Sequence, residues 1–356
     1  MLKISTNNYP IFCGTDSLVE FPSFLESLKP SAVFIVTDRN SQRNSLPLFL
    51  IDADADAYPV CILNAGEENK KWLSCERIFS FLISHQADRT AVLVNLGGGV
   101  VTDTGGFSAS VYKRGIRYIN IPTTLLAMVD ASVGGKTGID FQGIKNVLGT
   151  FTHPEGVFIS PTFLHSLPNE ELISGFGEMV KHAFIAGGKN WERISELKNL
   201  SAERNDWTSL ISESVSVKKK IVEEDFKERS IRKVLNFGHT IGHALESYFM
   251  AENAPITHGE AIMLGMIAES FISCRMTGMS ESDLTKLTEL VKRHFPNRYQ
   301  LPHPKELYRF LANDKKSVNG KAGCYLFKAI GKPDGMYFPE PAILDESVEY
   351  ISKVIS

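Results

Sequence analysis

Three histidines and one glutamate in the second half of the chain have the chemistry of metal ligands. His239 and His243 lie four residues apart, so on a helix they share one face and suit one zinc ion. His258 stands at the expected start of another helix, and Glu178 lies on a third. Thr240 follows His239, which excludes the H-E-x-x-H protease motif. Two imidazoles and a carboxylate form a common catalytic zinc set, but four side chains compete for three positions.

The first half contains a glycine triplet suited to binding an anion. Gly97, Gly98 and Gly99 follow the apolar run Ala91–Leu96 and precede small and apolar residues that we expect to be helical. Without Cβ atoms, these glycines let the backbone turn sharply and present N–H groups to a phosphate at the helix start. A tight strand-to-helix turn without a ligand would use the same residues.

Glycine and lysine recur together shortly after the triplet. The run VGGKTG at 133–138 contains Lys136, and GIKN at 143–146 contains Lys145. We expect both segments to be loops, because glycine-rich loops with a lysine commonly hold phosphate groups. Together with the triplet, they predict binding of a nucleotide and of a phosphorylated substrate.

A layered α/β domain would position these loops. Alternation of short apolar runs with helical segments predicts a mostly parallel sheet. The expected strands are 32–37, 60–63, 91–96, 118–122 and 157–159. Asp38 follows the first of them, where a dinucleotide fold often places an acid for a ribose hydroxyl, although a helix cap would explain it equally well. No G-x-G-x-x-G follows that strand, so the usual dinucleotide fingerprint is absent.

Helical periodicity dominates after Pro168. The expected helices are 170–186, 191–200, 207–224, 232–250, 259–276 and 281–293. We therefore expect two domains, 1–160 and 161–356, with the active site in the cleft between them.

Composition narrows the function classes. The 356 residues carry a net charge of −3 with charges spread along the chain, which gives no reason to expect nucleic acid or anionic membrane as a partner. No signal peptide or membrane span is visible, so we expect a cytoplasmic protein. Five cysteines without a C-x-x-C pair indicate neither a disulfide framework nor a thiolate zinc site.

Long blocks of the sequence resemble the 3-dehydroquinate synthases of the sugar phosphate cyclase superfamily. In the family's order, and from about residue 66 to 316, they are GGGVVTDTGGFSASVYKRGI, IPTTLLAMVDASVGGKTGI, GIKN, GFGEMVKHAFI, RKVLNFGHTIGHALE, THGEAIMLGM and DKK. The resemblance implies a Rossmann-like α/β domain that binds NAD, followed by an all-α domain that binds metal and substrate. It also implies a homodimer.

The resemblance assigns the cofactor positions. Glu178, His239 and His258 match the family's ligands for Zn²⁺, with Co²⁺ as an alternative, and His243 matches a substrate-site histidine. The positions that match the NAD site are Asp38, Glu67, Lys70, Gly98, Gly99, Val100, Val101, Thr102, Asp103, Thr123, Thr124, Asp130, Lys136, Lys145, Phe163, Leu164, His165, Ser166, Leu167 and Glu171.

The resemblance also implies the reaction. The substrate is 3-deoxy-D-arabino-heptulosonate 7-phosphate, a phosphorylated sugar acid. Its C5 hydroxyl is oxidised by NAD, phosphate is eliminated, the hydride returns, and an intramolecular aldol step closes 3-dehydroquinate in the shikimate pathway of aromatic amino-acid biosynthesis. The matching substrate positions are Arg114, Lys136, Lys145, Asn146, Lys181, Lys218, Arg232, Asn236 and His243, and one of Lys315 and Lys316, with Lys316 preferred, is expected to reach the phosphate. Lys219 and Lys220 are expected to be a solvated helix face.

Four positions depart from the family pattern. Thr102 stands for a usual glycine, Phe226 and Ser230 for a usual acid and a usual glycine, and Ser166 for a usual threonine. None of these changes removes a charged group that the chemistry needs.

Three other functions compete with this one. Related cyclases make 2-deoxy-scyllo-inosose or valiolones with the same fold and cofactors, but Asn236, His243 and the Lys145-Asn146 pair favour the dehydroquinate synthases. A metal-dependent polyol dehydrogenase would release NADH. A scaffolding protein without activity is disfavoured, because every matched ligand and cation is present.

Overall fold

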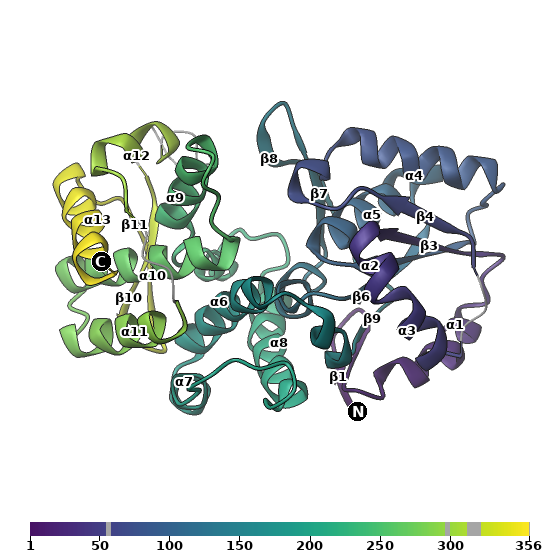
Figure 1. Ribbon diagram of the computed structural model, residues 1–356, viewed down its shortest axis with the longest axis horizontal. Helices are drawn as coiled ribbons and strands as arrows, with labels where there is room; N and C mark the ends of the chain where they lie inside the picture. The colour runs from purple at the N-terminus through teal and green to yellow at the C-terminus, as the bar shows by residue number, and fades with distance from the viewer. Residues whose placement is uncertain (55–57, 296–299, 312–321, 356) are drawn as a thin grey trace. The chain divides into compact units, whose positions relative to one another are not determined.

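The computed structural model describes residues 1–54, 58–295, 300–311 and 322–355 (Figure 1). The chain forms two compact units: Met1–Pro168 with Ala202–Lys227, and Asn169–Ser201 with Glu228–Ser356. The sequence pattern predicts one boundary near residue 160, whereas the chain returns to the first unit after residue 201. The cause is α8 (Trp207–Glu224), which packs against β1 (Leu2–Ser5) and β2 (Pro10–Cys13) of the first unit.

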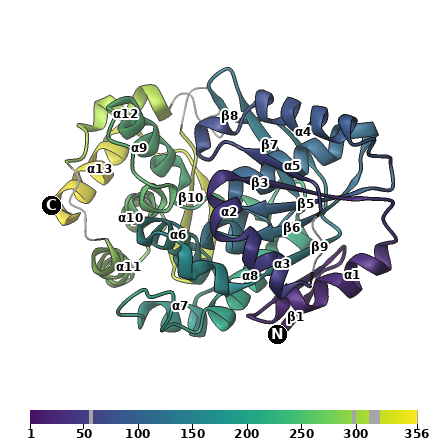
Figure 2. The same cartoon turned by 45° about the vertical axis from the view of Figure 1, so that its right-hand side comes forward.

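A seven-stranded sheet forms the centre of the first unit. Its order is β1-β2-β9-β6-β5-β3-β4, and only β1 and β2 pair antiparallel. The other strands are β3 (Val33–Asp38), β4 (Val60–Leu63), β5 (Val92–Gly97), β6 (Arg117–Pro122) and β9 (Gly156–Ile159). Figure 2 shows β3, β5, β6 and β9 in succession across the sheet. The expected parallel α/β architecture is confirmed.

The sheet has a topological switch point between β3 and β5. From β3 the chain passes to β4 on one side and then to β5 on the other, with Thr37 opposite Leu96. The carboxyl ends of both strands therefore lie side by side, where doubly wound sheets bind their ligands. Helix α2 (Arg39–Asn44) follows β3, and α5 (Gly99–Val111) follows β5.

Helices cover the sheet because its central strands are apolar on both faces. Every residue of β5 is buried. One core cluster joins Phe34 and Leu93 of the sheet with Ile78 and Leu82 of α4 (Trp72–Ser84). The remaining helices of this unit are α1 (Phe21–Leu28) and α3 (Leu46–Asp52). The strands whose carboxyl ends form the switch point are thus fixed by a packed core.

The two lysine-bearing segments are not the loops expected from sequence. They form a hairpin of β7 (Lys136–Phe141) and β8 (Ile144–Phe151). Gly138 pairs with Gly149, and a Cβ on Gly138 would lie 2.8 Å from the carbonyl oxygen of Leu148. These two glycines permit close strand pairing, which is why glycine content alone gave a wrong prediction here.

The second unit is helical, as expected, with one small hairpin. Its helices are α6 (Asn169–Ala186), α7 (Gly188–Ser195), α9 (His239–Ala251), α10 (His258–Met276), α11 (Glu281–His294), α12 (Pro304–Leu311) and α13 (Pro341–Ile355). The hairpin joins β10 (Cys324–Ala329) and β11 (Lys332–Tyr337). The all-α expectation missed it. Figure 1 shows α10 among the other helices, and it contacts α6, α9, α11 and α13.

One expected helix, 232–250, is interrupted. A 3₁₀ turn covers Ile231–Asn236, and α9 begins at His239 after Gly238. Gly238 is the N-cap of α9 and has φ +79°, a left-handed conformation that glycine adopts without strain. Among the helices that the structure describes, none combines the length and apolar character needed to cross a membrane.

Candidate metal centre and nucleotide-binding edge

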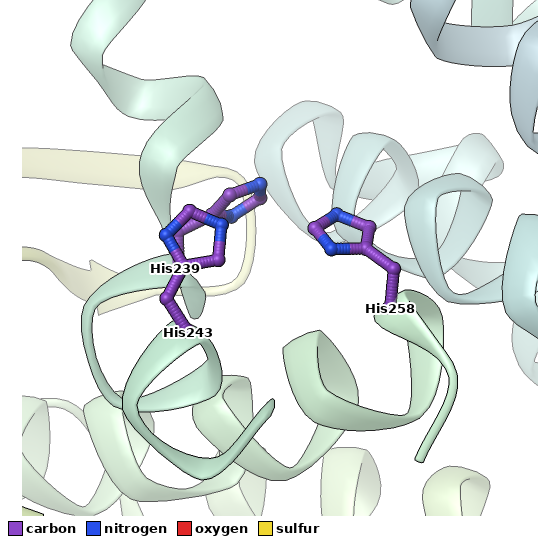
Figure 3. A group of neighbouring side chains, drawn as sticks. All are labelled: His239, His243 and His258. Atoms are coloured by element: carbon purple, nitrogen blue, oxygen red, sulfur yellow. The ribbon is translucent and has the colours of Figure 1, made fainter. Parts of the chain in front are cut away.

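The three histidines converge in the second unit. His239 and His243 point from the first two turns of α9, and His258 from the start of α10 (Figure 3). The ring centroids lie 5.1 to 5.8 Å apart. One ring nitrogen of each lies within 4.8 Å of the others, close enough for all three to reach one ion.

Glu178 of α6 completes the cluster. Its Oε1 atom lies 3.7 Å from Nε2 of His239 and 3.7 Å from Nε2 of His258, and the carboxylate is fully buried. Tetrahedral zinc with bonds near 2.1 Å places its ligand atoms about 3.4 Å apart. The set Glu178, His239 and His258 therefore fits around one divalent cation after a small contraction. His243 is in the same cluster, so the geometry brings together all four candidates.

Both histidines proposed to contact the cation with Glu178 have an oxygen atom near their other nitrogen. Nδ1 of His239 lies 3.2 Å from the carbonyl oxygen of Phe237, and Nδ1 of His258 lies 3.8 Å from Oε2 of Glu246. A proton held on Nδ1 leaves the Nε2 lone pair for a metal. Burial opposes a charge on His258, but Glu178 and Glu246 outweigh it and raise its pKa to about 9. A cation must displace that proton when it binds.

Backbone contacts at glycine bring the three helices close enough for this geometry. A Cβ on Gly259 would lie 1.9 Å from the carbonyl oxygen of Ser174, and one on Gly265 would lie 1.9 Å from that of Gly238. A Cβ on Gly177 would lie 2.7 Å from the carbonyl oxygen of Gly259. Gly177, Gly238 and Gly259 each adjoin one of the three ligands in sequence. These glycines and Glu246 are candidate positioning residues that the sequence pattern did not indicate.

Two buried cations and one half-buried amide of the second unit are predicted substrate residues. Lys181 is buried and contacts Oε2 of Glu178. Arg232 is also buried, and Asn236 donates to Oε1 of Glu228 at 2.6 Å. Lys316 lies outside the described residues. Glu171, a predicted NAD residue, lies in the first turn of α6, where burial raises its pKa.

The carboxyl edge of the sheet in the first unit is tied together by hydroxyl groups. Asp38 accepts from the backbone N–H of Ser41 at 2.8 Å and so caps α2. The Ser41 hydroxyl lies 3.2 Å from that of Thr123, whose N–H donates to the carbonyl oxygen of Gly97. The helix-cap interpretation of Asp38 is therefore confirmed, and its role toward a ribose stays a prediction.

The glycine triplet turns directly from β5 into α5. A Cβ on Gly97 would lie 2.6 Å from the side chain of Val101, and one on Gly98 would lie 3.1 Å from Thr124. Gly98 is the N-cap and has no side chain to accept from the first turn, so N–H groups remain for an anion. The buried Thr102 hydroxyl donates to the carbonyl oxygen of Gly99 at 3.2 Å, within its own helix. This departure from the family pattern therefore fits α5.

Two predicted NAD residues form a buried ion pair. Nζ of Lys70 lies 2.6 Å from Oδ2 of Asp103, and Lys70 is 6% exposed. Glu67 lies in the 3₁₀ turn that precedes Lys70. The pair connects that turn to the first turns of α5, so it positions the glycine triplet's helix.

Lys218 differs from its two lysine neighbours. It is buried, forms an ion pair with Asp130, and donates to the carbonyl oxygen of Asp130 at 2.7 Å. Lys219 is half-buried and lies 3.7 Å from Glu223, whereas Lys220 is exposed. The burial of Lys218 and the greater exposure of Lys219 and Lys220 agree with the distinction drawn from the sequence. The roles of the three lysines stay predictions.

The β7–β8 hairpin displays its substrate candidates on a bulge. Ile139 pairs with Leu148 but Phe141 pairs with Ile144, so Asp140 opposes three residues of β8. Asn146 has φ +50°, and its N–H donates to Oδ1 of Asp140 at 2.7 Å. Bulges of this kind re-aim side chains, here those of the Lys145-Asn146 pair. Asp140 was not singled out from sequence.

The remaining candidates of the first unit lie on turns and a strand end. Arg114 has φ +69° in the turn after α5, and Lys136 is exposed at the start of β7. The segment 163–167 lies in and after the 3₁₀ turn Pro161–Ser166, with Phe163 and Leu164 buried and His165 and Ser166 exposed.

Comparisons with known proteins identify the family of the chain. Residues 60–174 match the family model of the 3-dehydroquinate synthase N-terminal region, and residues 175–317 match that of the C-terminal region. The chain is 41% identical over 313 residues to the 3-dehydroquinate synthase of Parabacteroides distasonis, which covers 88% of this chain and 89% of that protein.

Solved structures share the fold. A 2-deoxy-scyllo-inosose synthase complexed with carbaglucose-6-phosphate, NAD⁺ and Co²⁺ superposes with a TM-score of 0.87 at 24% identity, covering 98% of this chain and all of that chain. The 2-epi-5-epi-valiolone synthase of Streptomyces hygroscopicus subsp. jinggangensis, with NAD⁺ and Zn²⁺ bound, gives 0.83 at 23% identity and 99% coverage of both chains. At these identities the likeness establishes the fold.

Proposed function

Because the chain belongs to the 3-dehydroquinate synthase family, we propose that its histidine cluster holds a divalent cation and that its sheet edge binds NAD. The activity is that of the family, a phosphate-eliminating cyclase of the carbon–oxygen lyase class. It converts 3-deoxy-D-arabino-heptulosonate 7-phosphate into 3-dehydroquinate and phosphate. We assign this step to the shikimate pathway, in the cytoplasm.

The metal centre carries the proposal. Glu178, His239 and His258 hold the cation, supported by the two equal 3.7 Å separations and by the Nδ1 partners that leave Nε2 available. Zinc is the proposed ion and cobalt the alternative, because nitrogen and carboxylate ligands suit both. When bound, the cation polarises the sugar's hydroxyl oxygens and NAD reversibly accepts a hydride.

NAD is proposed to lie along the edge formed by β3, β5 and β6. Asp38 is placed for a ribose hydroxyl, and the N–H groups at Gly98 and Gly99 for the pyrophosphate. Thr123 and Thr124 follow β6 at the same edge. The register of β3 and β5 supports this placement, since it aligns Asp38 with the glycine turn.

The substrate's two anionic groups require several fixed cations. We propose that Lys136, Lys145 and Arg114 of the first unit, with Lys181 and Arg232 of the second, bind the carboxylate and phosphate. The positive charge of these side chains supports the proposal, because charge-assisted hydrogen bonds to carboxylate and phosphate oxygens are the strong ones. The chain's contribution is then mainly orientation, which is worth about 7–11 kcal/mol when reacting groups are held in place.

A phosphate-release assay tests the function. The protein is incubated with Zn²⁺, a catalytic amount of NAD and the heptulosonate phosphate, while phosphate and NADH are measured together. One phosphate per substrate without net NADH supports the proposal. Net NADH from a polyol would instead indicate a dehydrogenase, and turnover of a hexose 6-phosphate alone would indicate a related cyclase. No reaction with any of these substrates would indicate a scaffold.

We also propose a homodimer. The edge strand β8 pairs only with β7 among the described strands, and it exposes Ile144, Val147 and Phe151. A long apolar edge strand favours pairing with another chain. Light scattering should give twice the chain mass, and a monomer mass at micromolar concentration would contradict the proposal.

A further inference from the structure

A buried glutamate outside the ligand set contacts the backbone on both sides of His239. Glu269 lies on α10 and is fully buried. Its Oε2 atom accepts from the N–H of Gly238 at 2.9 Å, and its Oε1 atom accepts from the N–H of Thr240 at 3.1 Å. Both carboxylate oxygens are thus used on the two peptide units that flank one proposed ligand.

These bonds replace a cap that α9 lacks. The N-cap of α9 is Gly238, which has no side chain to accept from the first turn. The first N–H groups of a helix have no partner within it, and an anionic acceptor there is favoured by the helix dipole. Glu269 supplies that acceptor from a neighbouring helix.

Gly265, one turn before Glu269, completes the contact. A Cβ at Gly265 would lie 1.9 Å from the carbonyl oxygen of Gly238, so only glycine lets this peptide rest against α10. Gly265 thus leaves room for the carbonyl group of Gly238, and Glu269 accepts a hydrogen bond from the N–H of Gly238. The Thr240 hydroxyl adds a bond to the carbonyl oxygen of Gly323 at 2.6 Å.

We propose that Glu269 is a positioning residue for the metal centre. By fixing the backbone at Gly238 and Thr240, it fixes where the His239 ring starts, and the bond from Nδ1 of His239 to Phe237 then sets its orientation. The inference rests on the proposed metal centre. It assigns a role to a buried residue outside the proposed ligand set.

Cobalt titration tests the role directly. Wild type, Glu269→Ala, Glu269→Gln and Ser273→Ala are purified without metal and titrated with Co²⁺, while the visible absorption spectrum and the dissociation constant are recorded. Ser273 is the matched control: it lies one turn further along α10, is equally buried, and accepts from the N–H of Phe327 at 3.2 Å. Thermal unfolding of each metal-free protein is measured in parallel.

The expected order separates positioning from general stability. Glu269→Ala should bind Co²⁺ about tenfold or more weakly, as is typical when an outer partner of a ligand is lost, with an altered spectrum. Glu269→Gln should be intermediate, because an amide oxygen can accept only one of the two bonds. Ser273→Ala should unfold at lower temperature yet keep wild-type affinity and spectrum.

Two results would overturn the inference. Wild-type Co²⁺ affinity and spectrum in Glu269→Ala, with only a lower unfolding temperature, would reduce Glu269 to a structural role. If Glu269→Ala does not fold, wild-type affinity and spectrum in Glu269→Gln would have the same meaning. Wild type that binds no Co²⁺ would instead overturn the metal centre itself, which distinguishes the two failures.

Discussion

The metal centre and the nucleotide-binding edge are constructed in opposite ways. At the edge, neighbouring strands bring Asp38 and the glycine turn together through sheet register, and the hydroxyl groups of Ser41 and Thr123 connect α2 to the strand ends. At the proposed metal centre, three helices supply one proposed ligand each, and the distances between these ligands depend on glycine contacts such as that of Gly259 with Ser174. The comparison suggests that small changes in packing should affect metal binding more than NAD binding.

Removal of a ligand should give the largest effect and separate the two regions completely. His239→Ala should lose more than about 100-fold in metal affinity, since even outer partners are worth about 10–100-fold. NAD affinity should not change, because the first unit supplies the edge. Metal content by mass spectrometry and NAD binding by calorimetry check both expectations.

Lys136→Ala is the complementary variant for His239→Ala. It should keep the metal, because the proposed ligands lie in the second unit. It should lose most activity, because Lys136, an exposed cation of the first unit, is proposed to bind the substrate's anionic groups. Equal metal content in wild type and His239→Ala would refute the ligand choice.

The buried ion pair of the first unit should give the next largest effect. Lys70→Met leaves the Asp103 carboxylate buried without its cation, which typically costs about 3–5 kcal/mol of unfolding free energy. NAD affinity should fall as well, with metal content unchanged. Urea unfolding and NAD titration measure the two effects.

An exposed ion pair of similar length serves as the control for Lys70→Met. Lys328 lies 2.6 Å from Asp334, but its side chain is 62% exposed. Lys328→Met should therefore lower the free energy of unfolding much less than Lys70→Met does. Comparable losses in the two variants would show that Lys70 and Asp103 do not form a buried pair.

A single methyl group should disturb the metal centre through packing. In Gly259→Ala the new Cβ would meet the carbonyl oxygen of Ser174 at 1.9 Å, so α6 and α10 must separate. We expect about 1–3 kcal/mol of destabilisation, as for other overpacked cores, and weaker metal binding with unchanged NAD binding. Gly335→Ala, where a Cβ meets nothing within 4 Å, should change stability by less than about 0.5 kcal/mol. Wild-type metal affinity in Gly259→Ala would show that metal binding does not depend on the close contact between Gly259 and Ser174.

Local pattern predicted the architecture well where burial alone decides it. Continuous apolar runs identified β3, β4, β5, β6 and β9 within a residue or two, and helical periodicity identified α6, α8, α10 and α11 in the same way. The four candidate ligands also follow from residue type and spacing. These features depend on contacts within one element or between neighbouring strands.

Contacts between distant segments could not be predicted in this way. The sequence of α8 does not show that it packs on β1 and β2. The hydrophobic periodicity of a helix identifies its buried face but not the element that covers this face. Asp140, Glu246 and Glu269 lie close to groups in other parts of the chain, which are the N–H of Asn146, the His258 ring and the N–H groups that flank His239. In the sequence, each of the three cannot be distinguished from an ordinary carboxylate on a helix or strand. The Lys136 and Lys145 segments were misread because glycine serves both loops and closely paired strands.

The outer carboxylate of His258 should give the smallest effect and the sharpest test of side-chain orientation. Glu246→Leu removes the acceptor 3.8 Å from Nδ1 of His258 and should weaken metal binding about tenfold. Glu246→Gln keeps an oxygen that can accept, so its loss should be smaller. Glu252→Gln, an exposed change at the end of the same helix, should leave Co²⁺ affinity unchanged. If Glu246→Leu binds Co²⁺ like wild type, the ring of His258 is held by packing alone. Metal affinity would then not depend on the carboxylate behind this ring.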